Sequence, residues 1–474
     1  MAVPNPFRRT DENTRICWGF TIQPSSDHLT AEESTRLRFS YDKLADECLD
    51  LLNEISPPTA PAVRHTEPPR QSPSAGDQPA KRDLYLLLEA HRDQHPKLQE
   101  LWTEVTTIPP WVDWAQIERG QEMFYRYGGA TIVGLAYQSL LGGMGANKIA
   151  EVLARTGGFS VKVARHRLFE TTKFVLECTQ SRESLQTGGA GFASAIRVRL
   201  LHAAVRKRIL KLAENRPDYY NVQEYGVPIN DLDCIGTIVS FSTNIVFISL
   251  PRQGIFPLKQ EEADYIALWR LIAHYMGTPT DFFSSPATAR AVMESLIMTE
   301  IQPSPTSATL ANNVIRCLEN TPPAYASRPF LEASARWLNG NELCDSLGLG
   351  HPAWYYWILV AGQCLFFCTI YYLHRLISWV DPRWDKRKIK SVKRTLWQLI
   401  NGKYGLQGEK TVFEFKHIPE FGTHTDLGPA EEKRVLRRDT EWRSAQTLVL
   451  AMALCGVLAW SALAGARLVL TSVL

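Results

Sequence analysis

A long stretch with helical spacing follows a glycine-rich turn at Gly188–Gly191, and it constrains the fold more than any other part of the chain. Its apolar residues recur at intervals of three, four and seven, which places them on one face of a helix: Ala195, Val198, Val205, Ile209 and Leu212. His202 falls in phase with them, so we expect its imidazole to face the interior. Arg199 and Arg206 flank that histidine at helical spacing.

A histidine on an apolar helix face has two interpretations. It is most often a core residue whose hydrogen bonds are satisfied, because histidine is commonly part-buried. It can also be a metal ligand, and a buried neutral imidazole near two permanent cations suits an iron ligand with carboxylates close by. The spacing of His202 alone leaves both interpretations open and favours the core residue.

Charge and cysteine usage exclude several classes of protein. The chain has 474 residues, enough for two or three average domains or one large helical domain. A net charge of +3 is too small to indicate nucleic acid as a partner. The nine cysteines are scattered without a Cys-x-x-Cys pair, which argues against a zinc site or a secreted disulfide scaffold. The polar, basic start of the chain predicts no secretory signal peptide.

Composition and periodicity divide the chain into six expected segments. Few β signals compete with the helical patterns, so the predicted fold class is all-α, a multi-helix domain with a C-terminal membrane-associated helix or helices. The segments are an N-terminal helical extension (1–55), a Pro-rich flexible linker (56–82), an all-α domain (83–350), an apolar membrane-associated or buried helix (351–380), a basic polar segment (381–445) and a transmembrane helix (446–470).

Within these segments, caps and breakers place individual helices. Thr30, followed by Glu32 and Glu33, begins a helical pattern that continues to Leu52. Asn230 can cap the helix that follows it. Further helices are expected at residues 83–105, 117–141, 147–156, 160–178, 231–242 and 261–277.

Two apolar stretches near the C-terminus are long enough to cross a bilayer. Trp354–Leu373 and Thr447–Ala466 each contain no Asp, Glu, Lys or Arg across 20 residues. The second is preceded by the basic run Lys433–Arg438 and predicts a transmembrane helix. The first is predicted to span, to be a buried core helix or to be an interfacial anchor. Because the basic region Arg383–Arg394 and the large N-terminal domain are both expected in the cytosol, we favour one tail anchor and a membrane-touching first stretch.

Arg167 and Thr171 lie one turn apart on the predicted 160–178 helix, so both project to one side. From the pattern alone, such a pair is more often a solvated face than a site.

Four ordered blocks resemble the rubber oxygenase (latex clearing protein) superfamily and its fungal branch. That branch includes the endoplasmic-reticulum-bound oxygenase of mycophenolic acid biosynthesis, which cleaves a farnesyl side chain. Arg167–Thr171 resembles the family's Arg-x-x-x-Thr helix, and Ile196–Arg206 resembles its haem helix. The other two blocks are Gly226–Asn230 with Phe241–Ser242, and Trp269–Arg270 with Gly277.

The resemblance implies an all-α domain that holds haem b. His202 would be the proximal iron ligand, which leaves the opposite face of the iron open for dioxygen. Arg167 and Thr171 would match the catalytic pair near the haem, where arginine can pair with propionates or an oxyanion and threonine can hydrogen-bond oxygen. Arg199 and Arg206 would be cofactor-binding residues.

One position departs from the family pattern. Rubber oxygenases often have a lysine just before the threonine, able to sit on iron in a closed resting state, whereas this chain has Glu170. Its carboxylate can act as a base toward an allylic proton or simply cap its helix. His274 is a second candidate pocket residue, although a core or surface position is the more common one for histidine.

The resulting expectation is a haem-dependent oxygenase that oxidises or cleaves a C=C bond of an apolar, isoprenoid-like substrate, in the manner of secondary metabolism. Its partners would be that substrate, dioxygen and a membrane, with no nucleic acid. We expect the endoplasmic reticulum membrane, with the catalytic domain facing the cytosol. The alternatives are a non-catalytic membrane-anchored helical protein and a haem-binding protein without turnover.

Overall fold

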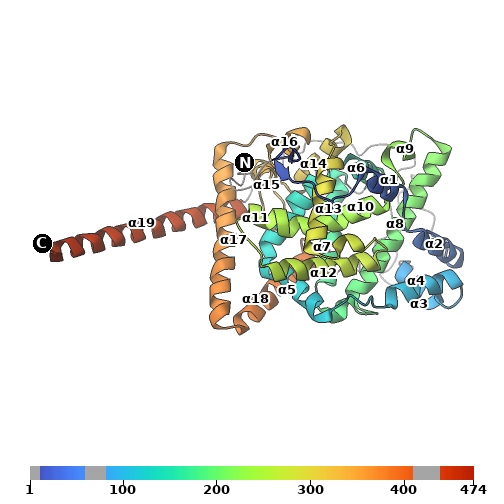
Figure 1. The fold of residues 1–474 in the computed structure, drawn as a ribbon, viewed down its shortest axis with the longest axis horizontal. Helices are drawn as coiled ribbons and strands as arrows, with labels where there is room; N and C mark the ends of the chain where they lie inside the picture. The colour runs from blue at the N-terminus through green and yellow to red at the C-terminus, as the bar shows by residue number, and fades with distance from the viewer. Residues whose placement is uncertain (1–10, 59–81, 158, 409–437, 474) are drawn as a thin grey trace, which may run out of the picture.

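The computed structural model describes residues 11–58, 82–157, 159–408 and 438–473, and within these residues the protein is almost entirely helical (Figure 1). One short antiparallel pair of strands, β1 (Arg15–Cys17) and β2 (Phe20–Ile22), lies near the N-terminus. The predicted all-α fold class is therefore confirmed.

The helices of the N-terminal half end with the predicted haem helix, α8, which packs against α2, α3, α7 and η2. They are α1 (Ala31–Phe39), α2 (Lys43–Ile55), α3 (Leu84–His91), α4 (Pro96–Thr106), α5 (Trp114–Val133), the π-helical η1 (Gly134–Leu141), α6 (Asn147–Arg155), α7 (Val161–Cys178), the 3₁₀ turn η2 (Arg182–Leu185) and α8 (Ala190–Asn215).

The C-terminal half completes the domain and ends in long apolar helices. Its elements are α9 (Val222–Tyr225), α10 (Asp231–Phe241), η3 (Ile245–Ser249), α11 (Leu250–Arg252), α12 (Lys259–Tyr275), η4 (Asp281–Phe283), α13 (Pro286–Thr299), α14 (Pro305–Leu318), α15 (Arg328–Asn339), α16 (Asn341–Ser346), α17 (Trp354–Val380), α18 (Arg383–Asn401) and α19 (Asp439–Val473).

Local signals explain where several helices begin. The helical pattern expected from Thr30 does begin there, where Thr30 forms a capping box with Glu33 at the start of α1. Asn230 accepts a hydrogen bond from the backbone N–H of Asp233 at 2.9 Å, which confirms it as the cap of α10.

Two expected helices are each divided into two. Asp42 caps a new helix, α2, so the pattern from Thr30 to Leu52 is broken between Phe39 and Lys43. Pro96 occupies the first turn of α4 and splits the expected 83–105 helix, since proline suits a helix start and disrupts an interior.

Other expectations have different outcomes. Most of the expected 56–82 linker lies outside the described residues. The expected basic polar segment 381–445 contains a regular helix, α18, whose apolar side chains Ile389, Val392 and Ile400 pack on the main core. An amphipathic helix needs only one apolar face, so a strongly basic composition concealed it.

The core is built from paired helices. α5 packs along α12, α7 packs along α8, and α2 covers α8 from the N-terminal side. The largest fully buried side chain in the described residues is that of Trp269 on α12, which stacks on Phe241 of α10 with ring centroids 4.9 Å apart. Two of the blocks that carried the family resemblance therefore meet in the core.

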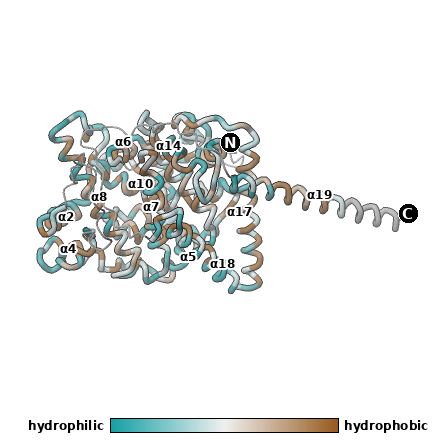
Figure 2. Tube along the Cα trace, turned by 180° about the vertical axis from the view of Figure 1, so that it is seen from behind, coloured by the Kyte–Doolittle hydropathy of each residue, from teal (hydrophilic) through white to brown (hydrophobic). Residues whose placement is uncertain are grey.

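The two apolar stretches have different positions. α17 lies along one side of the domain, and α19 leaves the domain beside it and points away (Figure 1). Both are hydrophobic in Figure 2 as far as they are described. By length and composition both are long and apolar enough to cross a membrane, and the bent α10–α11 region would be a third if counted as one span. A third of the apolar window of α17 is buried, against none of that of α19.

Candidate active site

The site residues predicted from the sequence lie mainly on a hairpin of two long helices, α7 and α8. Close to the turn, the Ser194 hydroxyl donates to the Glu177 carboxylate of the opposite helix. A Cβ on Gly191 would lie 2.8 Å from the Cα of Cys178, so only glycine allows this approach. The glycine-rich entry to α8 therefore sets the distance between the two helices.

His202 lies in the middle of α8 and has unusual surroundings for a core histidine. Neither imidazole nitrogen hydrogen-bonds to a residue that the structure describes, and the side chain is part-buried rather than sealed. Burial lowers the pKa of His202 to about 4, and the nearby positive charge of Arg206 adds to the effect. The imidazole is therefore neutral at physiological pH, with a lone pair available to a ligand.

Cys234 on α10 shares the electrostatic surroundings of His202. It is also only part-buried, and burial raises the pKa of its thiol to about 12. Both groups are close enough to Arg206 and Asp42 for those charges to shift their pKa values. The middle of α8 and the first turn of α10 therefore lie near the same pair of charges.

Arg167 and Glu170 meet on α7. The Arg167 Nη1 lies 3.1 Å from Glu170 Oε2, and His166 Nε2 lies 3.5 Å from the other carboxylate oxygen. Glu170 therefore pairs with side chains of its own helix. Thr171, the next residue, is exposed, and its hydroxyl forms no hydrogen bond with any of the described residues.

The register of the hairpin relates these residues to His202. Ser194 is level with Glu177, and the chain runs in opposite directions along the two helices. Counting equal numbers of residues from that contact brings Arg167 and Thr171 to within about one turn of the level of His202. This register gives the level of each residue along the hairpin, and contact of Arg167 or Thr171 with a group bound at His202 stays a prediction.

Arg199 and Arg206 have carboxylate partners that precede them in the chain, two from the N-terminal extension and one from α4. Arg199 is 2% exposed, and its guanidinium binds Asp42 at 2.6 Å and Glu104 at 2.8 Å. Arg206 Nε lies 3.4 Å from Asp46 Oδ1, and its guanidinium stacks over the Tyr41 ring at 4.9 Å. Contact with a cofactor stays a prediction for both residues, whose observed contacts fasten α1–α2 and α4 to α8.

Sequence reasoning missed these acidic partners because they lie about a hundred residues or more before the arginines. It also missed Asp233, one turn into α10, where burial raises the carboxyl pKa to about 7. Acidic residues in the first turn of a helix are common, so nothing local distinguished Asp233.

His274 on α12 has a different environment from His202. Its ring lies beside the Tyr275 ring, with centroids 5.6 Å apart, and its Nε2 is buried without a hydrogen-bond partner among the described residues. Burial lowers its pKa, and Glu104 and Arg199 are the charged groups near it. The structure places it against the Arg199 cluster, and a role in the pocket stays a prediction.

Comparison with known families decides what this helical domain is. A family model described as the catalytic domain of ER-bound oxygenase mpaB/B′ and rubber oxygenase matches residues 125–365, just over half of the chain. The chain belongs to this family. The matched region of this mpaB/rubber oxygenase domain contains α7, α8, α10 and α12, and hence all of the predicted site residues.

A solved structure shares the fold. The latex clearing protein LCP in its closed state aligns with a TM-score of 0.54 and 18% sequence identity, over 74% of this chain and 90% of the other. A comparison with curated protein sequences finds no significant match. The family supports an oxygenase, and so an oxidoreductase, as the class of activity, and the solved structure shows the shared fold.

Proposed function

We propose that this protein is a haem b-dependent oxygenase that oxidises or cleaves a C=C bond of an apolar, isoprenoid-like substrate at a membrane. The observation that carries the proposal is His202, a neutral, part-buried imidazole without a hydrogen-bond partner among the described residues, on helix α8 of the α7–α8 hairpin of an oxygenase-family domain.

The donor set around His202 suits a haem. No group of three or more His, Cys, Asp and Glu side chains converges on a common point anywhere in the described parts of the chain. A haem brings four nitrogen ligands of its own, so it would need only one further donor from the protein, and the His202 imidazole could be that donor.

When bound, the haem would supply the redox chemistry by which dioxygen is used. The residues of α7 would position the other reactants. The Thr171 hydroxyl is free to donate a hydrogen bond, and the Arg167 guanidinium is a charged donor for a developing oxyanion or a propionate. Glu170 would accept an allylic proton if its contact with Arg167 opened, and would otherwise hold the guanidinium in place.

An apolar substrate fits the membrane attachment that the two apolar helices suggest. Isoprenoid chains partition into lipid, so an enzyme beside the bilayer meets them at high local concentration. We propose the endoplasmic reticulum as the membrane, with the catalytic domain on the cytosolic side.

The deciding experiment is an absorption spectrum of the full chain, expressed with haem supplied, next to the His202→Ala variant. We expect a Soret band that is lost or shifted in His202→Ala, because the axial ligand is gone. The matched control is His274→Ala, which removes another part-buried imidazole of low pKa and should keep the parent spectrum.

The remaining outcomes separate the alternatives. No Soret band in any of the three proteins would contradict the proposal and favour a non-catalytic membrane-anchored helical protein. A band that follows His202, without oxygen consumption on any polyprenyl substrate, would indicate a haem-binding protein without turnover.

A further inference from the structure

We propose that the outer face of α17, with the basic α18 beside it, is a docking surface for a negatively charged bilayer. In this arrangement α17 lies in the plane of the membrane surface and α19 alone crosses the bilayer. The inference deepens the membrane part of the proposed function and does not depend on haem or turnover.

The outward face of α17 is a continuous apolar stripe. Ile358, Leu365, Tyr372, Leu376 and Trp379 follow one another at intervals of seven, seven, four and three residues, and so share one side of the helix. The first three are 37–43% exposed, and the exposed fraction reaches 62% at Leu376 and 84% at Trp379. A soluble surface rarely leaves such a row uncovered, whereas a helix lying in a membrane interface presents one.

The loop before α12 adds to this stripe. The backbone N–H of Phe256 donates to the Tyr372 hydroxyl at 3.3 Å, which holds the loop against α17. Phe256 and Leu258 are themselves 61% and 46% exposed. The apolar surface is therefore wider than one helix.

The buried polar and charged contacts of the inward face of α17 argue against a membrane-spanning position for this helix. His374 is 4% exposed and binds Asp385 at 2.9 Å, and Asp385 in turn binds Arg126 of α5 at 2.8 Å. Tyr371 and Tyr127 share a hydrogen bond of 2.8 Å, and Tyr127 donates to Glu261. If α17 crossed the bilayer, this charged network and the α5 and α15 helices packed on it would enter hydrocarbon, at a prohibitive cost.

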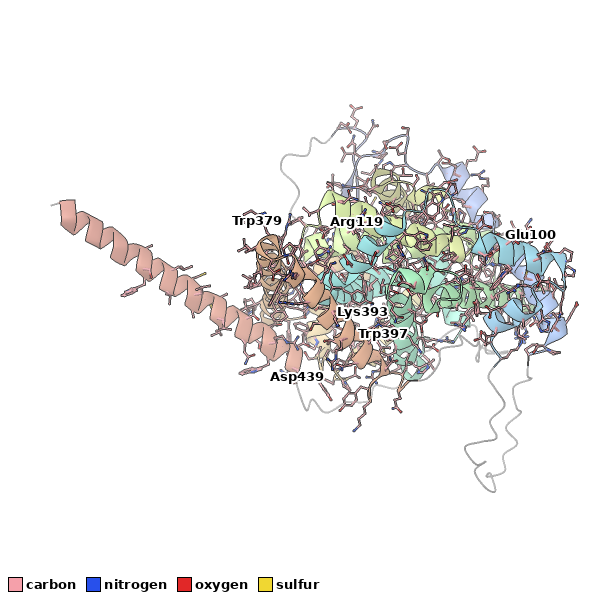
Figure 3. All side chains as sticks on the ribbon, turned by 90° about the horizontal axis from the view of Figure 1, so that it is seen from below. Glu100, Arg119, Trp379, Lys393, Trp397 and Asp439 are labelled. Atoms are coloured by element: carbon pink, nitrogen blue, oxygen red, sulfur yellow. The ribbon has the colours of Figure 1, made fainter. Side chains whose placement is uncertain are left out.

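The path of α19 sets the orientation. Its first turns are fixed to the domain, since Ser444 is buried and Glu441 accepts a hydrogen bond from the backbone N–H of Ser327 at 2.9 Å. From there α19 leaves across α17 and away from the domain (Figure 1). Figure 3 shows Asp439 and Trp379 on that same side of the molecule. The surface of a bilayer crossed by α19 would therefore run parallel to α17 and lie against its outer face.

Charge indicates what kind of bilayer fits. Arg383, Arg387, Lys390 and Arg394 are exposed at intervals of four, three and four residues, which makes a basic stripe along α18. None of their side chains forms an ion pair with a carboxylate in the described parts of the chain. Trp384 lies in the first turn of the same helix and is 42% exposed. Unpaired cations next to exposed tryptophans are typical of contact with anionic headgroups.

This arrangement puts the catalytic domain and the basic α18 on the same side of the bilayer. A topology test uses the full chain inserted into sealed vesicles from outside, with His351→Cys before α17 and the exposed Lys403→Cys beyond α18. A membrane-impermeant maleimide should label both positions, as read out by peptide mass spectrometry. Labelling of only one of the two would show that α17 spans and would overturn the proposal.

Docking itself is tested by the accessibility of the stripe. In vesicles of phosphatidylcholine with phosphatidylserine, Leu376→Cys should lose most of its maleimide labelling. The matched control Leu86→Cys, on α3 and 52% exposed, should keep it. Equal labelling of the two would mean that the domain hangs free on its anchor and would overturn the proposal.

The role of charge has its own comparison. Adding Arg387→Glu and Lys390→Glu to the Leu376→Cys variant should return its labelling to the Leu86→Cys level in anionic vesicles. Arg92→Glu with Lys97→Glu, at the far end of the domain, should leave Leu376→Cys protected. Protection that is the same in vesicles of phosphatidylcholine alone, and unaffected by charge reversal, would contradict an anionic partner. A normal haem spectrum beside failed docking would leave the proposed oxygenase intact.

Discussion

Arg199 shows what a buried charge does in this domain. Its guanidinium is almost completely removed from water and is balanced by Asp42 and Glu104, from two helices distant in sequence. These carboxylates raise its pKa further, against the effect of burial. A pair of this kind contributes little net stability over an apolar contact, but removing one partner leaves an uncompensated charge.

Arg199→Gln should therefore lower the free energy of unfolding by about 3–5 kcal/mol, because Asp42 loses its counter-charge in a buried site. Lys207→Gln on the same helix is the control, since the Lys207–Asp50 pair is exposed and should contribute under about 1 kcal/mol. Denaturant unfolding of the detergent-solubilised chain measures both. Equal effects would show that Arg199 does not fasten α2 to α8.

Asp233 predicts a pH dependence of stability. Its pKa is about 7 in the folded protein and 3.8 in a model peptide, so the folded state retains a proton that the unfolded state releases. Stability from this group is complete below pH 4 and is lost as the pH rises to about 7. Asp233→Asn should flatten that fall in melting temperature between pH 4 and 7. Asp46, whose pKa is raised to about 6 by burial, would leave a smaller slope of the same sign. An unchanged profile would refute the assignment.

At the scale of elements, the end of α12 shows how a local rule and a tertiary contact combine. Gly277 follows the helix with φ +68°, the left-handed conformation that glycine adopts most readily after a helix. It also lies against the Arg199–Asp42 pair, where an added Cβ would come within 2.6 Å of Arg199 Nε. The glycine that ends this family block therefore leaves room for the Arg199–Asp42 ion pair, which joins the start of α2 to α8.

Gly277→Ala should destabilise the protein more than the backbone strain of about 1–2 kcal/mol, because the new methyl group would displace the ion pair. Gly188→Ala separates the two effects, since Gly188 has φ +83° and open space around its Cβ position. Thermal unfolding in detergent compares them. If both variants lose the same stability, the contact with Arg199 and Asp42 is unimportant.

At the scale of the whole molecule, α19 divides into a docked base and a free apolar helix. Glu441 and Ser444 are buried against the domain, whereas Val449 and Leu450 are 59% and 71% exposed. An exposed apolar helix of this length satisfies its backbone hydrogen bonds internally and is stable in hydrocarbon.

A chain that ends at Leu448 should therefore keep the fold but lose integral membrane attachment. Alkaline carbonate should extract this truncated protein from membranes and leave the full chain in the pellet. The absorption spectrum serves as the check that the domain still folds. A full chain that carbonate also extracts would show that α19 does not span.

The sequence by itself determined the features that depend on neighbours along the chain. Helical spacing placed His202, the Asn230 cap and the apolar α17 and α19, because these signals repeat every three to four residues and need no partner. The ordered motifs then predicted the family. Where one helix was predicted and the structure has two, the prediction was wrong only at a short break, at which Asp42 or Pro96 begins a new helix.

Only the tertiary structure decided what each side chain meets. The carboxylates that bind Arg199 and Arg206 lie far away in sequence, so no local pattern could show that these two arginines are paired with acidic residues. The same is true of the part-buried imidazole of His202, which hydrogen-bonds to no residue that the structure describes, and of the charged network behind α17. Periodicity shows which face of a helix is apolar, but whether protein, cofactor or lipid covers that face depends on packing between distant elements.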